Sequence, residues 1–179
     1  MDINLLLRRV DKGDRSAFAE LVEHLQRPLF GYLGRMGLRQ GQAEEVAQET
    51  FLRAWQRLGD YDQARAAFST WLFTIARNLA INELTRASSS HEQTFGEDMP
   101  EMACERRQPA QEVMNRQLRL QVQQALRMLP YDDRSALALA YYEELDMSSI
   151  ARIEGCTVGA IKVRLHRAKQ RLRQLLENT

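Results

Sequence analysis

The strongest chemical signal in the sequence is a run of basic side chains near its C-terminal end. Between Lys162 and Arg173, six of twelve residues are Lys or Arg and none is acidic, although the whole chain has a formal net charge of only +1. Such a local concentration of cations suits contact with the phosphates and base edges of double-stranded DNA. The alternative interpretation is a solvated basic face on an amphipathic helix, which needs no ligand.

A helix-turn-helix layout surrounds this basic run. Asp146 is suited to cap a short helix, Gly155 to form a turn, and Thr157 to cap a second helix. One stripe of the second helix is apolar and comprises Ile161, Leu165, Ala168, Leu172, Leu175 and Leu176. We predict that the polar side enters the major groove. Its candidate DNA-binding residues are Lys162, Val163, Arg164, His166, Arg167, Gln170 and Arg171.

A second signal lies in residues 68–84, which hold more apolar and aromatic side chains than one buried helix face requires. The expected core stripe comprises Phe68, Leu72, Ile75 and Leu79. Trp71 and Asn78 are seven residues apart and therefore share another side of the helix. An aromatic ring and an amide near Arg77 would suit single-stranded DNA, because bases stack on rings. The alternative is that these aromatic residues belong to the core.

Motifs for catalysis or metal binding are absent from the sequence. It contains no P-loop, nucleophile-elbow or zincin pattern, and its three histidines are far apart. Cys104 and Cys156 have no second Cys or His at zinc-ligand spacing. We therefore expect neither an enzyme nor a metal site, and no cofactor.

Helical periodicity divides the chain into two lobes. Residues 16–33, 43–58 and 69–86 are predicted to form helices, and Ser69 is a candidate cap for the third. The second of these helices is expected to bury Ala47, Phe51, Trp55 and Leu58 on one stripe. Helical spacing resumes at Val113, after an acidic stretch without apolar periodicity. We predict an all-α fold with two small helical domains, residues 1–87 and 113–179, joined by a flexible acidic linker, residues 88–112.

The sequence also bears on the compartment. Its longest apolar run, Ala136 to Tyr142, is far shorter than the roughly 20 residues that span a bilayer. The first residues lack the basic and apolar regions of a secretory signal. We therefore expect a cytoplasmic protein that does not insert into a membrane.

Four stretches of the sequence resemble, in the same order, the segments of one protein family. DRSAFAELVEHLQRPLFGYL is similar to the start of region 2 of the extracytoplasmic-function (ECF) class of bacterial sigma factors. AEEVAQETFLRAWQRLGDYD resembles that family's polymerase-docking helix, and FSTWLFTIARNLAINELTR resembles its promoter-melting segment. The stretch from Leu129 to Leu176 resembles region 4, with the helix-turn-helix. The resemblance covers nearly the whole chain outside the linker.

This resemblance implies a function and site residues. The chain would direct RNA polymerase core to specific promoters and initiate transcription, in a stress or envelope response. The polar side of the second helix would bind the clamp helices of the polymerase through Glu45, Gln48, Glu49, Leu52, Arg53 and Gln56. The loop from Tyr61 to Phe68 would hold a flipped base of the minus-ten element. The minus-ten set, the residues expected to bind this single strand, is Tyr61, Phe68, Trp71, Arg77 and Asn78.

The resemblance further implies that the basic helix reads the minus-thirty-five element. The acidic linker would run through the polymerase toward its RNA exit path. The expected partners are therefore RNA polymerase core, through its clamp helices and flap, promoter DNA, and an anti-sigma factor, soluble or anchored in a membrane. Two other classes stay open on the residues alone: a stand-alone helix-turn-helix regulator that binds duplex DNA unaided, and a helical adaptor that reads no DNA.

Overall fold

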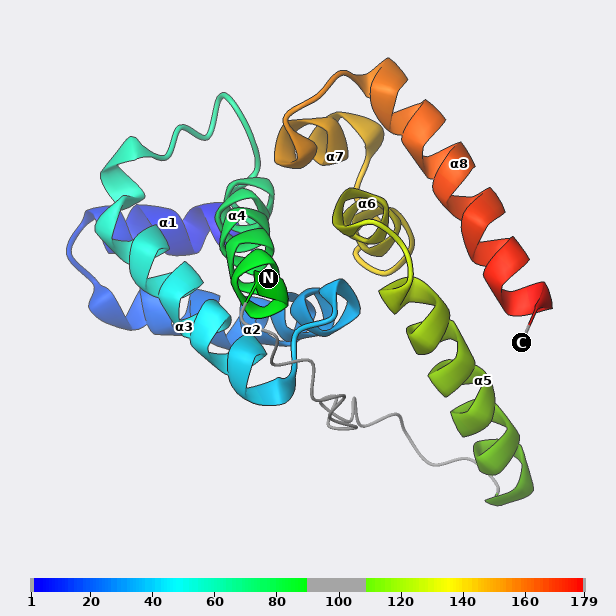
Figure 1. Ribbon diagram of the computed structural model, residues 1–179. Helices are drawn as coiled ribbons and strands as arrows, with labels where there is room; N and C mark the ends of the chain where they lie inside the picture. Colours follow the sequence, from blue (N-terminus) through cyan, green and yellow to red (C-terminus); the bar gives the residue numbers. More distant parts are fainter. Residues whose placement is uncertain (1, 90–108, 179) are drawn as a thin grey trace.

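The structure, a computed structural model, describes residues 2–89 and 109–178, and within these ranges it is helical without a strand (Figure 1). This confirms the predicted all-α class. The α-helices are α1 (Ile3–Asp11), α2 (Arg15–Met36), α3 (Gln40–Gln56), α4 (Phe68–Ser89), α5 (Pro109–Arg127), α6 (Tyr131–Tyr141), α7 (Met147–Glu154) and α8 (Val158–Glu177), and a 3-10 helix, η1, spans Leu58–Asp60. We call α1–α4 the first lobe and α5–α8 the second lobe.

Side-chain caps fix the helix starts in the first lobe. The Asp2 carboxylate accepts hydrogen bonds from the first turn of α1, a helix that the sequence analysis did not predict. The Asp14 carboxylate caps α2 and accepts from the Ser16 amide at 3.0 Å. Hydrogen bonds from Ser16 and Arg9 hold the pKa of Asp14 at about 2. Gly37 ends α2 with a φ of 98°, a left-handed conformation that favours glycine.

The helix-turn-helix of the second lobe has the predicted caps. Asp146 accepts hydrogen bonds from the Ser148 and Ser149 amides at the start of α7. Gly155 ends this helix with a φ of 64°, and Thr157 then caps α8 by accepting from the Ala160 amide at 3.1 Å. Each cap satisfies backbone groups that a helix end leaves unpaired. These residues therefore fix where α7 ends and where α8 begins.

The two lobes pack against each other. Helix α2 contacts α6, and α4 contacts α7 (Figure 1). One cluster of buried side chains includes Leu29 and Tyr32 from the first lobe with Leu139 and Ile150 from the second. Each lobe is small and would bury little apolar surface alone, so the shared cluster adds core to both. A second cluster, around Leu21, lies within the first lobe.

The predicted core stripe of α3 is partly wrong. Trp55 is 39% exposed and packs edge-on against Phe18, with ring centroids 4.9 Å apart. Of the predicted stripe only Ala47 is fully buried, and the other buried residues of α3 are Ala43, Val46, Thr50 and Ala54. Their small side chains allow α3 to approach α2 and α4 closely, so the larger Trp55 lies at the margin of the helix contact.

Two predicted helix starts also differ from the structure. Helix α4 begins at Phe68, and the carbonyl of Ala67 accepts the Trp71 amide at 3.1 Å. Ser69 therefore lies inside the first turn and is not the cap. Helix α5 begins at Pro109, four residues before Val113, because proline is well tolerated at a first helical position. Most of the predicted linker, residues 90–108, lies outside the described residues.

Both sides of α4 are buried, which explains its excess of apolar residues. Phe68 and Leu72 face the cluster within the first lobe. Phe73, Ala76 and Ala80 belong to the cluster that the two lobes share. The helix is therefore sandwiched between its own lobe and the second lobe.

Candidate nucleic-acid interface

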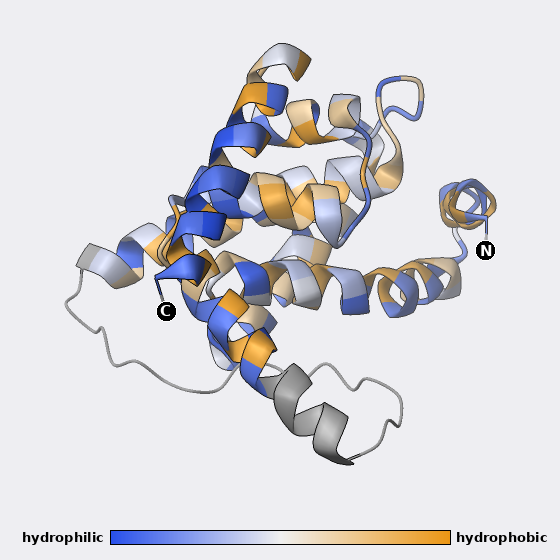
Figure 2. Cartoon of the chain, turned by 90° about the vertical axis from the view of Figure 1, so that its right-hand side faces the viewer, coloured by the Kyte–Doolittle hydropathy of each residue, from blue (hydrophilic) through white to orange (hydrophobic). Residues whose placement is uncertain are grey.

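Helix α8 lies at the surface with its basic side outward. Ile161, Leu165 and Ala168 are buried against α6 and α7. Lys162, Val163, His166, Arg167 and Gln170, all predicted DNA-binding residues, are exposed. Figure 2 looks onto α8 and shows mainly hydrophilic residues along its outward side. The exposed side is the right size and charge to enter a major groove.

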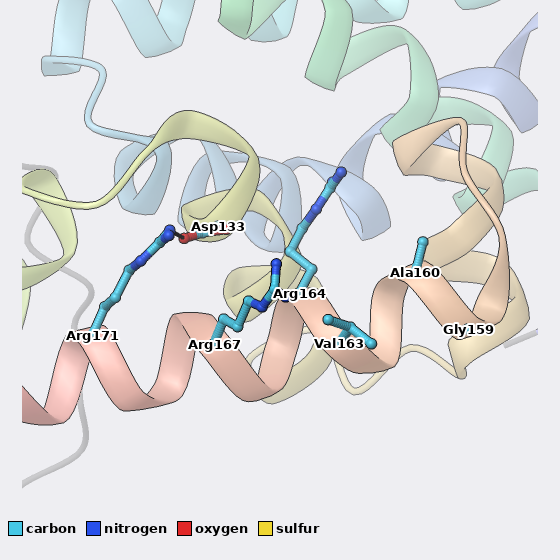
Figure 3. A pocket seen from close by; sticks show the side chains of 7 residues that line it. All are labelled: Asp133, Gly159, Ala160, Val163, Arg164, Arg167 and Arg171. Atoms are coloured by element: carbon cyan, nitrogen blue, oxygen red, sulfur yellow. Dashed lines mark hydrogen bonds and ion pairs between the residues drawn. The ribbon is translucent and has the colours of Figure 1, made fainter.

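The other two predicted readers on α8 form ion pairs with buried carboxylates. Arg164 reaches Glu154 at 2.8 Å, and Arg171 reaches Asp133 at 2.5 Å. Figure 3 shows Arg171 directed at Asp133, with Arg167 between the two paired arginines along the helix. A groove of about 430 Å³ follows this side of α8, lined by Asp133, Gly159, Ala160, Val163, Arg164, Arg167 and Arg171. The ion pair with Glu154 therefore holds Arg164 toward the protein, whereas the Arg171 side chain stays 53% exposed beside Asp133.

Glu154 is the centre of a polar network between the lobes. Its side chain is 0% exposed and accepts from Ser135, whose hydroxyl is 2.8 Å from the Tyr32 hydroxyl of the first lobe. Because a serine hydroxyl has a single proton, Ser135 donates to Glu154 and accepts from Tyr32. Arg77 of α4 also pairs with Glu154, at 3.0 Å, and with Asp132, at 2.7 Å. Burial lowers the pKa of Arg77, but the pairing with Glu154 and Asp132 outweighs burial and raises it.

Three aromatic residues of the minus-ten set form a cluster at the start of α4. Tyr61, Phe68 and Trp71 have pairwise ring-centroid separations of 5.4 to 5.6 Å. Phe68 is buried, whereas Tyr61 and Trp71 are partly exposed. The Tyr61 hydroxyl donates to the Ala66 carbonyl at 3.0 Å and fixes the shape of the loop before α4. Phe68 thus supports two rings that solvent can reach.

The remaining two residues of the minus-ten set differ in their exposure to solvent. Asn78 is exposed, whereas the Arg77 side chain is only 13% exposed and points into the lobe interface. Its Nε is buried and has no hydrogen-bond partner among the described residues. Arg77 is therefore committed to the second lobe in this conformation.

The predicted polymerase-binding residues lie on the outer side of α3. Glu45, Gln48, Leu52, Arg53 and Gln56 are exposed, and Leu52 is 50% exposed. Glu49 pairs with Arg53 at 2.6 Å along the helix. This face combines one exposed leucine with charged and amide groups, the composition of a protein interface with a polar rim.

The buried polar residues of the lobe interface are not apparent from the sequence. Tyr32, Ser135 and Glu154 were not singled out, nor was Arg134, whose guanidinium donates to the Met36 carbonyl at 2.6 Å. Nothing in their spacing separates them from ordinary helix-surface residues. One signal in the sequence could have indicated a buried polar interface: Arg77 is a cation within an unusually apolar helix.

Comparisons with known proteins identify the family. Residues 21–90 match the family described as Sigma-70 region 2, and residues 119–172 match Sigma-70 region 4. The ECF sigma factor SigW of Bacillus subtilis is 31% identical over an alignment of 185 positions, gaps included, that covers 99% of this chain and 98% of SigW. The chain belongs to the ECF sigma factors. The family's RpoE from Cereibacter sphaeroides is 34% identical over 173 residues, covering 94% of this chain and 92% of that protein.

Solved structures show the same fold. CnrH, in complex with the cytosolic domain of CnrY, has a TM-score of 0.70 at 21% identity, over 99% of both chains. RpoE of Bartonella quintana, in complex with the anti-sigma factor NepR, also has a TM-score of 0.70, at 24% identity, over 89% of this chain and 96% of RpoE.

As an ECF sigma factor, this chain is a transcription initiation factor that directs RNA polymerase core to specific promoters. Its partners are therefore the polymerase core and promoter DNA. Among the described residues, no helix is both long enough and apolar enough to cross a membrane. The same residues contain no group of three or more His, Cys, Asp or Glu that could hold a metal ion.

Proposed function

We propose that three separate surfaces of this sigma factor perform the three steps of initiation. The outer side of α3 docks on the polymerase, the aromatic cluster with Asn78 captures the displaced strand of the minus-ten element, and α8 reads the minus-thirty-five element. The observation that supports this proposal most directly is the outward side of α8, where Lys162 and Arg167 are exposed. In a chain of net charge +1, this local excess of cations supports duplex recognition.

The assignment on α8 distinguishes readers from positioning residues. Arg167 is exposed and can form the bidentate pair that arginine makes with guanine. Arg164 is tied to the fully buried Glu154, so in this conformation it fixes α8 on the lobe, and the half-exposed Arg171 is paired with Asp133. We therefore assign base reading first to Lys162, His166 and Arg167.

The aromatic cluster suits a flipped base for a physical reason. Unstacking a base costs a few kcal/mol, and stacking on a protein ring returns about 1–3 kcal/mol per base. Tyr61 and Trp71 expose parts of their rings, and Phe68 holds them from behind. Asn78 adds an exposed amide that can bond a base edge.

The domain boundaries, the compartment and the regulation complete the proposal. Residues 1–87 act in polymerase binding and minus-ten melting, residues 113–179 act in minus-thirty-five recognition, and residues 88–112 link them. We place the protein in the cytoplasm, where polymerase acts, with no catalytic activity of its own. We also propose an anti-sigma factor as a third partner, the class of partner that RpoE of Bartonella quintana has in its complex.

Run-off transcription tests this proposal. The purified full chain and bacterial core polymerase are given fragmented genomic DNA, and the transcript starts are mapped. We expect discrete starts that share two upstream motifs at a fixed spacing and that disappear when the chain is left out. Duplex binding by the chain alone, without new starts, would instead indicate a stand-alone regulator.

A further inference from the structure

The lobe interface brings together two arginines that the sequence places in the binding sets of different promoter elements, Arg77 in the minus-ten set and Arg164 on the basic helix. Arg77 of α4 and Arg164 of α8 both bond the same carboxylate oxygen of Glu154, at 3.0 and 2.8 Å. The two guanidinium groups are therefore within a few bond lengths of each other. Any state in which both meet their separate DNA sites must take them apart.

The spacing of the promoter elements shows how far apart the two arginines must move. The minus-ten and minus-thirty-five elements are about 25 base pairs apart by name, which is roughly 85 Å of B-form DNA at about 3.4 Å per base pair. The packed lobes share one core cluster and cannot span that distance. Promoter engagement therefore requires separation of the lobes.

We propose that Glu154 is an intramolecular competitor of promoter DNA that holds Arg77 and Arg164 and keeps the free sigma factor closed. This inference rests on the proposed function, because it takes both arginines to be DNA-contacting groups in the open state. Glu154 is a positioning residue: it acts on DNA recognition only through the arginines that it binds.

The polar contacts around Glu154 make the closed state specific. The carboxylate has three partners, Ser135, Arg77 and Arg164, and its side chain is fully buried. Ser135 and Arg164 lie in the same lobe as Glu154, so Arg77 is the partner that is lost when the lobes separate. Loss of a partner by a buried carboxylate is costly, and this cost stabilises the closed state. Tyr32 adds a hydrogen bond from the first lobe through Ser135.

The same interface also contains features that ease opening. The Nε of Arg77 is buried without a partner among the described residues, and an unsatisfied buried donor opposes burial. Asp132, the second partner of Arg77, has a side chain that is 52% exposed, and exposed pairs contribute little. The closed state therefore depends mainly on Glu154 on this side of the interface. Phosphate groups offer Arg77 and Arg164 a new anionic partner once the lobes separate.

Fluorescence resonance energy transfer between two dyes, one on each lobe, measures the fraction of molecules in which the lobes have separated. Gln26 and Gln174 are exposed, lie in different lobes and are outside the proposed binding surfaces, so each is replaced by cysteine for labelling. Serine replaces Cys104 and Cys156 in the same full-length chain. We expect the free protein to be mainly closed. Tyr32→Phe removes one hydrogen bond across the interface and should raise the open-to-closed ratio about fivefold, and Glu154→Gln should raise it about tenfold or more.

A matched control and a second measurement distinguish a positioning role of Glu154 from a general loss of folded structure. Glu177→Gln removes the exposed carboxylate that pairs with Arg173 at 2.7 Å on α8, and it should leave the ratio unchanged. Closure leaves α3 exposed, so the test depends on polymerase holding both lobes, α3 through the clamp helices and the second lobe through the flap, which only the open state allows. While the closed state dominates, the concentration of sigma factor that half-saturates core polymerase should then fall by the same factor as the ratio rises. A purely structural role for Glu154 would weaken this binding instead.

Three results would overturn the inference: a wild-type chain that is open when free, a Glu154→Gln variant with an unchanged ratio, or more opening without tighter polymerase binding in both variants. Failure of the proposed function gives a different result. In that case the wild-type chain does not bind core polymerase or support transcription, whatever the energy transfer reports.

Discussion

Leu139→Ala is expected to lower the free energy of unfolding by about 2–5 kcal/mol, the cost of truncating a buried leucine. Leu139 is 0% exposed in α6 and belongs to the cluster that both lobes share. The loss should therefore be felt in the first lobe as well as the second. A chain of this size has little stability to spare, so an effect of this size is easily measured.

Denaturant unfolding followed by two probes checks this prediction. Both tryptophans, Trp55 and Trp71, are in the first lobe, so their fluorescence reports on that lobe alone, whereas circular dichroism reports on all helices. Both transitions should move together. Leu5→Ala is the matched control, because Leu5 is 56% exposed and its truncation should cost less than about 0.5 kcal/mol. A fluorescence transition that stays in place would contradict a shared core.

Trp71→Ala is expected to reduce the formation of open promoter complexes by about 5- to 150-fold. This range corresponds to the loss of about 1–3 kcal/mol of stacking on one displaced base. The conservative variant Trp71→Phe keeps a ring between Tyr61 and Phe68, so we expect it to recover much of the activity. Binding of the variants to core polymerase should be unchanged, because the docking surface lies on α3.

Open-complex formation is measured by the reactivity of unpaired thymines and by run-off transcription from one promoter. A template that is already unpaired across the minus-ten element separates two roles of Trp71. If the ring stacks on a captured base, the Trp71→Ala defect persists on that template. Normal activity of Trp71→Ala on ordinary duplex promoters would contradict a stacking role.

The helix-turn-helix could be predicted because its signals are local. Asp146, Gly155 and Thr157 are turn and cap residues a few positions apart, and the structure has each in the predicted role. The outward side of α8 follows from helical periodicity in the same way. Short-range hydrogen bonds and a regular period are properties of the sequence itself.

The packing of the lobes could not be predicted because it joins residues far apart in the chain. Tyr32 and Ser135 are 103 positions apart and form one hydrogen bond across the interface. The excess of apolar residues in α4 indicated that a second side of this helix has a role. It did not show which role, because a second buried side and a DNA-stacking side have the same composition. Phe73, Ala76 and Ala80 proved to be the second buried side, whereas Trp71 is partly exposed.

Side-chain size explains why the position of Trp55 was predicted wrongly. Apolar periodicity indicated a stripe through Trp55, but α3 packs through Ala43, Ala47 and Ala54, which allow close approach of its neighbours. Periodicity gives the direction of a buried face only approximately, and close helix contacts favour small residues within it.

The most direct test of the account is transcription from a promoter library randomised at both elements, with core polymerase and either the wild-type chain or Arg167→Ala. Sequencing of the transcribed templates gives the base preference at each position. We expect Arg167→Ala to relax the base preference at one or two positions of the upstream element, by about 5- to 150-fold at each, and to leave the downstream element unchanged. Unchanged upstream preference, or equal relaxation of both elements, would contradict the assignment of α8 to minus-thirty-five recognition.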